Sequence, residues 1–563
     1  MWIDGLALLW GSVFDVRSIL YLFAVIVIAL VGALVFTFGP MLLSQYTSKL
    51  NNLPGPKSTS WIYGQMKRIH GESEASVVQE TWVKEYGSET LMYNGLLNIP
   101  RLWTLDLRAL NHILTHSNDY PKPEVARRAL SNLLSDGLLS AEGELHRQQR
   151  RVMNPAFGPA QIRDFTETFL DKSIELRDAW MGEVEKNGSP ARIDALSWLS
   201  RATLDIIGLA GFNYHFHSIN PDGKPNELNE AFIHIFSPKT SVSVIAVLRM
   251  FFPIFRYVPN IQGRRVARAK AVMRQIGMDL IAQKKAEIAE EKGVVTSERS
   301  GSMRGRDLLT LLLKANMATD IPDHQRMPDE DVLAQIPTFF VAGHETTSTA
   351  TTWCLFALTQ APGVQTRLRE ELLAVPTDMP TMEELNELPY LDAVVRETLR
   401  LYAPVPNTMR QASKDDVIPV AEPFVDRHGV TQDSIRISAG DIVLIPIIAL
   451  NRSKKLWGED AAEFNPNRWL GEGLPDAVGP VPGVWGHMLT FLGGPRACIG
   501  YRFTLVEMKA LIFTLVRRFE FELAVPVEDV EKKQGAAVQR PRLRSDPEAG
   551  GQLPLLVKQH HAL

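Results

Sequence analysis

The chain has 563 residues, of which 45% are hydrophobic and 22% are charged, and its formal net charge at pH 7 is −4. This nearly balanced charge gives no argument for binding nucleic acid, and two cysteines are too few for a disulfide framework. The same cysteine usage indicates a reducing compartment for the main body. The length would ordinarily predict several domains, but the order of the motifs favours one large α-rich domain.

Residues 18–38 form a predominantly apolar stretch, and no charged residue lies between Arg17 and Lys49. About 20 apolar residues are enough to cross the hydrocarbon core of a bilayer. A cleaved signal peptide would have a shorter apolar region and a small-residue cleavage site. Basic residues after the stretch outnumber the single Arg17 before it, which places the main body in the cytosol. We therefore expect a single-pass transmembrane anchor at 18–38 and a luminal or interfacial N-terminus at 1–17.

Residues 39–56 follow the predicted anchor and end in a Pro-Gly-Pro sequence. Proline fixes its own φ and disfavours helix at the residue before it. We therefore expect a stiff, proline-rich hinge at 39–56, after which residues 57–563 form the main domain. Short strands are expected near the start of that domain, at 90–93 and 101–105.

A basic stretch at 143–151 contains His146 and Arg150, which would share one face of a helix. A guanidinium can bind a carboxylate with two parallel hydrogen bonds. The pair is therefore a candidate for holding an acidic group of a ligand. The alternative is a basic, solvated face that contacts a partner protein.

An apolar run at 332–358 contains Gly343, Glu345 and Thr346. Glycine and threonine are poor residues for the middle of a helix, so their clustering requires a reason. Gly343 would leave room for a small ligand, and an acid beside a hydroxyl can relay protons through water. The structural alternative is a core helix whose threonines bond back to carbonyls and whose Glu345 pairs locally. Pro337 should kink or start this helix because it removes a backbone hydrogen bond.

Glu397 and Arg400 lie three residues apart in a predicted helix at 389–402, a spacing that is common on helix surfaces. Arg410 follows after two prolines, and Arg468 lies further on in the sequence Phe-Asn-Pro-Asn-Arg-Trp. The Glu-x-x-Arg pair is weak evidence by itself. Its order and spacing relative to the later segments make it informative.

The segment that surrounds Cys498 sets this residue among glycines, an aromatic residue and an arginine. A thiolate needs positive charge or amide donors nearby to stay ionised. Gly494 and Gly500 would let the backbone fold closely around the sulfur and turn N–H groups towards it. Arg496 would supply a cation and Phe491 a flat apolar surface. This environment suits an axial thiolate ligand to haem iron, whereas the chain's other cysteine fits a small buried hydrophobe.

The order Phe-x-x-Gly-x-Arg-x-Cys-x-Gly at 491–500 resembles the haem-binding signature of the cytochrome P450 family at every fixed position. Ala-Gly-His-Glu-Thr-Thr at 342–347 is similar to the family's oxygen-activating motif. The resemblance covers the chain from about Pro54 to the C-terminus. One departure is Thr490-Phe491-Leu492, where many membrane-bound members have Pro-Phe-Gly.

The resemblance implies a mainly α fold with a small β region, preceded by one N-terminal transmembrane helix. It implies haem b with Cys498 as the axial thiolate ligand, and Thr346 and Glu345 as the residues that handle protons for oxygen. The residues implied to hold the haem are His146, Arg150, Arg410, Arg496, Phe491, Gly494 and Gly500. The implied structural triad on the proximal side is Glu397, Arg400 and Arg468.

The activity implied by the family is that of a monooxygenase, which inserts one atom of O2 into a lipophilic substrate and releases the other as water. No glycine-rich dinucleotide fingerprint follows a predicted strand, and the stretch after Cys498 is too short for a flavin domain. Electrons are therefore expected from NADPH–cytochrome P450 reductase, with cytochrome b5 as a second donor, at the endoplasmic reticulum membrane. The motifs resemble fungal members, many of which oxidise terpenoids, fatty acids or other secondary metabolites.

Two other classes of function stay open at this point. One is a haem-thiolate isomerase or dehydratase that needs no external electrons, against which the intact pair Glu345 and Thr346 argues. The other is a non-catalytic haem-binding or lipid-binding membrane protein. The fold does not give the substrate.

Overall fold

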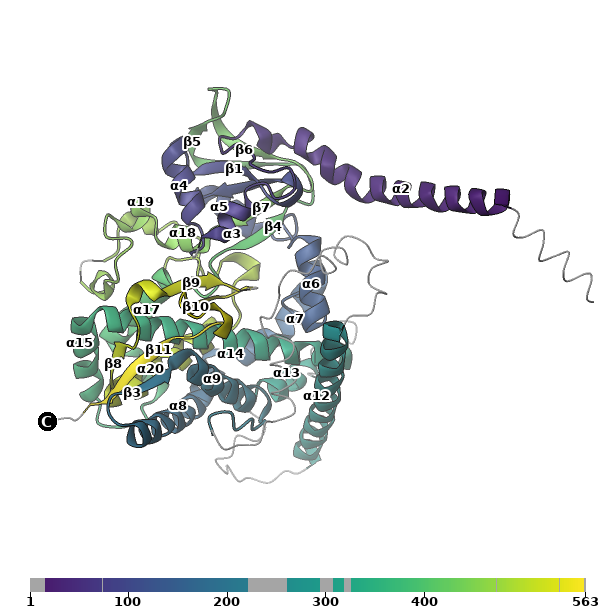
Figure 1. The fold of residues 1–563 in the computed structure, drawn as a ribbon. Helices are drawn as coiled ribbons and strands as arrows, with labels where there is room; N and C mark the ends of the chain where they lie inside the picture. The colour runs from purple at the N-terminus through teal and green to yellow at the C-terminus, as the bar shows by residue number, and fades with distance from the viewer. Residues whose placement is uncertain are drawn as a thin grey trace, which may run out of the picture.

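The computed structural model describes most of the chain, and the arrangement of these residues is mainly helical with small sheets, as the sequence predicts (Figure 1). The described residues are 16–72, 74–220, 261–293, 307–317, 326–471, 473–535 and 537–560. Most of the expected N-terminus at 1–17 lies outside this part of the chain.

Helices make up the bulk of the body. In chain order they are α3 (Met66–Gly71), α4 (Val77–Tyr86), α5 (Leu107–Thr115), α6 (Glu124–Leu134), α7 (Gly143–Met153), α8 (Pro159–Asn187), α9 (Ala195–Phe212), α12 (Ile261–Gly293) and α13 (Leu308–Asn316). They continue with α14 (Asp329–Gln360), α15 (Pro362–Leu373), α16 (Met382–Asn386), α17 (Pro389–Leu401), α18 (Ile447–Asn451), α19 (Lys454–Trp457) and α20 (Tyr501–Arg518).

Four small sheets complete the described fold. The largest has the order β1 (Thr90–Asn94), β2 (Pro100–Thr104), β7 (Ile442–Ile445) and β4 (Thr408–Gln411). The others are β5 (Asp416–Val425) with β6 (Thr431–Ile437), β9 (Val530–Gln534) with β10 (Gln539–Leu543), and β3 (Ala191–Asp194) with β11 (Pro554–Gln559) and β8 (Phe519–Leu523). Strands β1 and β2 confirm the two expected strands to within one residue and pair antiparallel.

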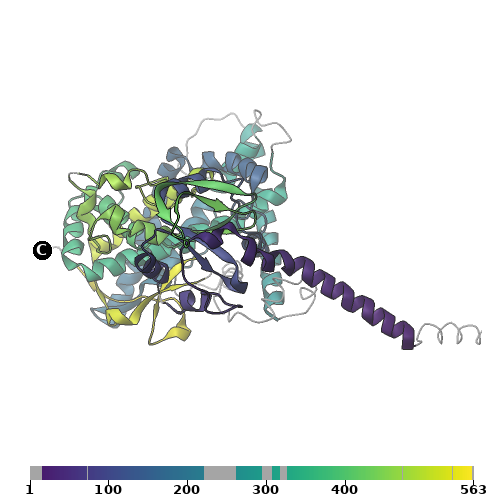
Figure 2. The same cartoon turned by 90° about the horizontal axis from the view of Figure 1, so that it is seen from above.

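Helix α2 (Val16–Thr47) projects from the body on the side opposite the C-terminus (Figures 1 and 2). The helix runs through Gly39-Pro40 and continues for about two turns, into the segment at 39–56 that was expected to be a hinge. Among the described residues, no helix meets the length and apolarity needed to cross a bilayer. The anchor at 18–38 therefore stays a prediction.

The end of the expected hinge at 39–56 is packed against the body. Leu50 and Leu53 are buried, and the Ser48 hydroxyl donates to the carboxylate of Asp441 at 3.0 Å. The first part of the segment is helical, because it belongs to α2. The domain boundaries drawn from the sequence stay predictions.

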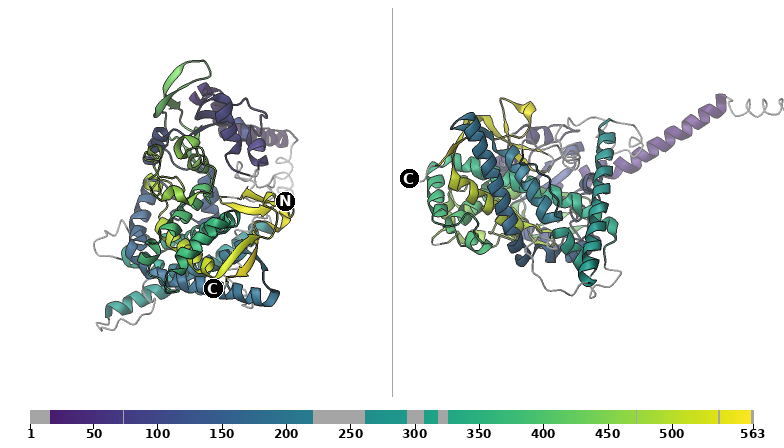
Figure 3. Two further views of the ribbon diagram at one scale, coloured as in Figure 1. Left: turned by 90° about the vertical axis from the view of Figure 1, so that its left-hand side faces the viewer. Right: turned by 90° about the horizontal axis from the view of Figure 1, so that it is seen from below.

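Helix α14 is the longest element buried in the body, where it packs against α9, while α20 packs against α8. Figure 3 shows α8 and α9 crossing the underside of the molecule, with α12 to one side. Three acidic residues fill the first turn of α14, where they favour the positive end of the helix dipole. The helix continues through Pro337, so this proline lies inside the helix and does not start it.

The interface between α14 and α20 contains a buried acid, Glu507, which is fully inaccessible to solvent. Neither of its carboxyl oxygens has a well-formed hydrogen bond in the described part of the chain. Burial raises the pKa of Glu507 well above the ordinary carboxyl value, and the nearby Thr347 hydroxyl opposes this only in part. Burial therefore favours the neutral carboxylic acid over the carboxylate at this position.

This raised pKa predicts how stability depends on pH. Because the folded pKa of Glu507 lies above the unfolded one, the acid stabilises the fold at low pH and loses that contribution as pH rises. The neutral variant Glu507→Gln should gain stability relative to wild type progressively over the pH range above the ordinary carboxyl pKa. Thermal unfolding midpoints of both proteins across this range test it, and a constant difference would contradict the assignment.

Candidate active site

Cys498 lies in a tight loop between a short 3-10 turn at Gly494–Arg496 and the start of α20. Its amide N–H donates to the carbonyl oxygen of Phe491 at 2.8 Å, which closes the loop. A Cβ at Gly493 would lie 1.6 Å from the carbonyl oxygen of Pro482, so no other residue fits this position. The sequence gives no signal for Gly493, because its close contact is with Pro482, in a different turn of the loop.

Gly494 and Gly500 serve this loop in different ways. Gly494 has a φ of +67°, and a Cβ there would lie 2.4 Å from the carbonyl oxygen of Leu114 in α5. A Cβ at Gly500 would make only an ordinary contact of 3.7 Å with the ring of Phe157. The contribution of Gly500 is its backbone N–H, which donates to the sulfur of Cys498.

Opposing effects act on the thiol of Cys498. Burial raises its pKa above the ordinary value, whereas the Gly500 N–H and the Arg150 guanidinium lower it. The cation beside the sulfur is therefore Arg150, whereas the sequence analysis assigned this position to Arg496. Cys498 as a residue is nonetheless accessible to solvent, so the surrounding protein atoms do not cover it completely. A thiol in such a place loses its proton when it coordinates a metal ion.

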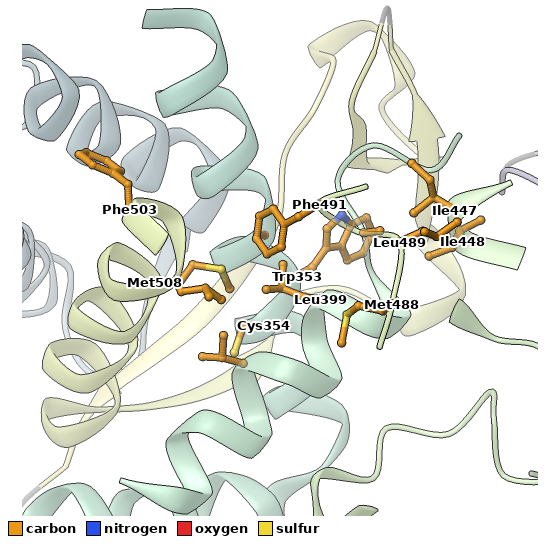
Figure 4. Close-up of a cluster of buried hydrophobic side chains, with 14 of the residues drawn as sticks. Trp353, Cys354, Leu399, Ile447, Ile448, Met488, Leu489, Phe491, Phe503 and Met508 are labelled. Carbon is orange, nitrogen blue, oxygen red and sulfur yellow. The ribbon is translucent and has the colours of Figure 1, made fainter. Parts of the chain in front are cut away.

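The aromatic residue of the loop, Phe491, is buried and supports the loop through ring contacts. Its ring packs against Trp485 and Tyr501, with centroid distances of 5.7 and 6.0 Å. Figure 4 shows Phe491 in the same apolar cluster as Cys354. Burial raises the pKa of Cys354 to about 12, which fits the small buried hydrophobe expected from the sequence.

Helix α7 brings His146 and Arg150 to the same region, on one helical face. The Arg150 guanidinium donates to the carbonyl oxygen of Ala497 at 2.5 Å, one residue before the cysteine. Burial, reinforced by nearby cations, lowers the pKa of His146 to about 3. His146 is therefore a neutral, buried hydrogen-bonding group rather than part of a solvated basic face.

Arg410 and Arg496 complete the predicted set of basic residues. Arg496 donates to the carbonyl oxygen of Ala141 at 2.7 Å and pairs with Glu142. Arg410, on β4, is only 3% exposed and donates to the Thr408 hydroxyl and to a backbone carbonyl. It has no carboxylate at ion-pair distance among the residues that the structure describes, and burial lowers its pKa to about 10.

Lys122, which precedes α6, is a further member of this cluster that the sequence did not indicate. Its ammonium group pairs with Glu142 at 3.2 Å, and burial lowers its pKa to about 8. A lysine at this place carries no sequence signal, because the chain brings it to the cluster only in the fold. Lys122 shares its carboxylate partner with Arg496.

The balance of charge in this cluster shows whether the site fits a haem. Four basic side chains gather here, and they are Lys122, Arg150, Arg410 and Arg496. Within the described part of the chain, only Lys122 and Arg496 form an ion pair, and both pair with the same carboxylate, Glu142. Buried positive charge in excess of negative charge is costly unless an anion neutralises it. A haem carries two propionate carboxylates, so the donor set and the thiol next to it fit this group.

On α14, the hydroxyl of Thr346 donates to the carbonyl oxygen of Ala342 at 2.7 Å. Two neighbouring carbonyl oxygens of α14 also accept hydrogen bonds from hydroxyls. Thr203 donates to the carbonyl of His344 at 3.0 Å, and Ser348 donates to the carbonyl of Glu345 at 3.1 Å. The back-bonding considered in the sequence analysis is therefore present. It coexists with partial exposure of Thr346, which the preceding turn of the helix at 341–345 shares, whereas the residues from Thr347 to Leu358 are buried.

Gly343 does not open room for a ligand, which corrects the expectation from the sequence. A Cβ at Gly343 would lie 2.9 Å from the side chain of Ile207, so the glycine lets α14 and α9 approach closely. The exposed residue of this turn is Ala342. Glu345 forms an ion pair of 2.6 Å with Arg540 on β10, a partner that lies almost 200 positions away in the sequence and that local patterns could not reveal.

The structure brings the predicted triad together. Glu397 and Arg400 are fully buried and joined by two hydrogen bonds of 2.8 Å, and Arg468 donates to the same carboxylate at 2.9 Å. The indole N–H of Trp469 donates to it at 3.0 Å. Arg400 also donates to the backbone carbonyls of Asn451, the last residue of α18, and of Ala461 in the segment that follows it. The carboxylate therefore joins α17 to that segment.

A thiol loop, a buried cation cluster beside it and a hydroxyl-rich helix indicate a haem-thiolate protein. Comparison with known proteins agrees, since the family model for cytochrome P450 matches residues 54–545. Cytochrome P450 monooxygenases 205 and 128 of Postia placenta are 58% and 55% identical to this chain over 93% of its length and 95% of theirs. Cytochrome P450 monooxygenase claP of Ampulloclitocybe clavipes is 35% identical over 94% of this chain and 98% of its own.

The chain belongs to the cytochrome P450 family, and it is an oxygenating oxidoreductase of the monooxygenase type. Family membership implies haem held by a cysteine thiolate, with electrons from a redox partner and a lipophilic substrate. Residues 54–545 agree closely with the extent of the resemblance noted in the sequence.

The buried triad generates a prediction for haem retention. Glu397→Ala leaves two buried arginines without their shared carboxylate, and Arg468→Ala leaves that carboxylate short of a donor. Each change should cost about 3–5 kcal/mol of stability and reduce the haem content per protein. Arg163→Ala, which breaks an exposed pair with Glu383, is the matched control and should retain normal haem. Normal haem content in both triad variants would contradict the assigned role.

Proposed function

We propose that this protein is a membrane-anchored haem-thiolate monooxygenase that inserts one oxygen atom from O2 into a lipophilic substrate. The observation that carries the proposal is the Cys498 thiol beside a buried cluster of cations with a single carboxylate partner. An isomerase or dehydratase would not require the proton-handling pair on α14. The named relatives are all monooxygenases, which supports the same choice.

In this proposal Cys498 holds the iron of haem b, and Phe491, Gly494 and Gly500 maintain the loop that presents its sulfur. When bound, the haem supplies the redox chemistry by which O2 is split. His146 donates a hydrogen bond, and the guanidinium groups of the cluster bind the propionates; these groups are Arg150, Arg410 and Arg496.

Thr346 and Glu345 deliver protons to the oxygen side of the site. The Thr346 hydroxyl can release its bond to Ala342 and turn towards the open side of α14, because a hydroxyl rotates at little cost. Glu345 then passes protons from solvent to that hydroxyl through water. The buried acid Glu507 takes no part in this transfer, since it lies on the side of α14 that faces α20.

Electrons come from NADPH–cytochrome P450 reductase, with cytochrome b5 as a second donor. The proposed substrates are terpenoids, fatty acids or other secondary metabolites, in keeping with the fungal relatives. The proposed location is the endoplasmic reticulum membrane, with the catalytic domain in the cytosol. Support for it comes from exposed apolar side chains on α2, namely Leu20, Tyr21, Leu22, Phe23, Val25, Ile26 and Ile28.

Removal of the proposed proton relay should uncouple electron use from oxygenation. Thr346→Ala, reconstituted with reductase and screened with dodecanoic acid and terpenoid substrates, should form about tenfold less product per NADPH and release more hydrogen peroxide. Thr346→Ser keeps a hydroxyl and should behave nearly as wild type. Product formation by wild type without NADPH would instead support an isomerase or dehydratase.

The proposed anchor is tested by deleting residues 1–47, which leaves the Ser48 cap and the packed Leu50 intact. Full-length protein should stay in the microsomal pellet after an alkaline carbonate wash, because its apolar helix lies in the bilayer. The shortened protein should move to the supernatant. Full-length protein that the wash releases would contradict a transmembrane anchor.

A further inference from the structure

Glu345, the proposed relay acid on α14, is held by a residue from the far end of the chain. Its carboxylate pairs with the guanidinium of Arg540 at 2.6 Å, and this is its only ion pair in the described part of the chain. The two side chains are 19% and 29% exposed, respectively. The pair therefore lies at the boundary between the buried helix and solvent, where protons would enter.

The hairpin formed by β9 and β10 fixes the position of Arg540. The strand carrying it is tied to α14 because the Trp353 indole donates to the carbonyl of Gln539 at 2.9 Å. The backbone N–H of Gln539 donates to the carbonyl oxygen of Pro404 at 2.7 Å. Gly551 leaves room for the arginine stem, since a Cβ there would lie 3.3 Å from Cδ of Arg540. The guanidinium is thus presented to α14 by a strand that is attached at several points.

We propose that Arg540 is a positioning residue for oxygen chemistry. It holds the Glu345 carboxylate at the solvent end of the proton route, so that the C-terminal hairpin controls proton delivery to Thr346. This inference rests on the proposed function, because it assigns a task to the relay acid. Arg540 itself forms and breaks no covalent bond.

The chemistry gives the inference a direct readout. Each NADPH supplies two electrons, and together with two protons these reduce O2 either to hydrogen peroxide or to one water plus one oxygen atom in the product. Slow proton delivery favours peroxide, whereas prompt delivery favours product. A residue that only stabilises the fold would change haem content or melting temperature without changing this ratio.

The chain offers a matched control on the same strand. Arg542 lies two positions after Arg540, is 28% exposed and pairs with Glu531 on β9. Arg542→Gln therefore removes a similar arginine pair from the same hairpin without touching α14. Arg540→Lys keeps a positive charge within reach of Glu345 and tests rescue.

The experiment reconstitutes the full-length holoprotein with reductase and dodecanoic acid, and measures both the peroxide released and the product formed per NADPH oxidised. Arg540→Gln should release about tenfold more peroxide per product than wild type, Arg540→Lys should recover most of the loss, and Arg542→Gln should match wild type. The double variant Glu345→Gln/Arg540→Gln should be no worse than Glu345→Gln alone, because Arg540 acts through that acid. The carbon-monoxide spectrum and haem content should be equal in all of them.

Two results would overturn the inference while leaving the proposed function intact. One is an Arg540→Gln protein that is coupled like wild type or like Arg542→Gln. The other is a double variant whose losses simply add. Wild-type protein that carries haem but consumes no NADPH with the reductase would instead overturn the proposed function, and this inference with it.

Discussion

The constraint on which this structure depends is the placement of charge inside the fold. Four basic side chains are gathered next to a thiol, and the described residues give the cluster one carboxylate, Glu142. Such an arrangement is unfavourable unless an anionic group completes it and a cation binds the sulfur. The protein alone raises the pKa of the Cys498 thiol, so the positive charge that favours the thiolate comes from the bound ligand. Stability and cofactor binding are therefore two aspects of one balance of charges.

The surrounding elements are arranged to maintain this balance. Glycines whose positions admit no side chain hold the cysteine loop in a single shape, and α7 and β4 deliver the arginines from two sides. The buried carboxylate of Glu397 joins α17 to the segment before the loop, because it accepts a hydrogen bond from Arg468. A network of this kind defines geometry more than it adds net stability, because desolvation offsets much of the attraction between its charges.

The sequence predicted the parts of the site that lie within short motifs. Cys498, its glycines and the helical pair His146 and Arg150 occur where local spacing indicated them. The triad was indicated by the resemblance to the family and not by local spacing, and the mainly α fold with its first two strands was predicted as well. Contacts between distant segments were not predictable, which is why the ion pair of Arg540, the cluster member Lys122 and the tight contact of Gly343 with Ile207 were missed. The roles of these three residues depend on which distant residues the fold brings next to them, and not on residue type.

The central claim is that Cys498 provides the thiolate ligand of a haem. The most direct test is the carbon-monoxide difference spectrum of the dithionite-reduced protein in detergent, measured beside Cys498→Ser and, as a control, Cys354→Ser. We predict a red-shifted Soret band in wild type and in the Cys354 variant, and no such band in the Cys498 variant. A folded, haem-containing wild type without that band, or a Cys498→Ser protein that retains it, would contradict the account.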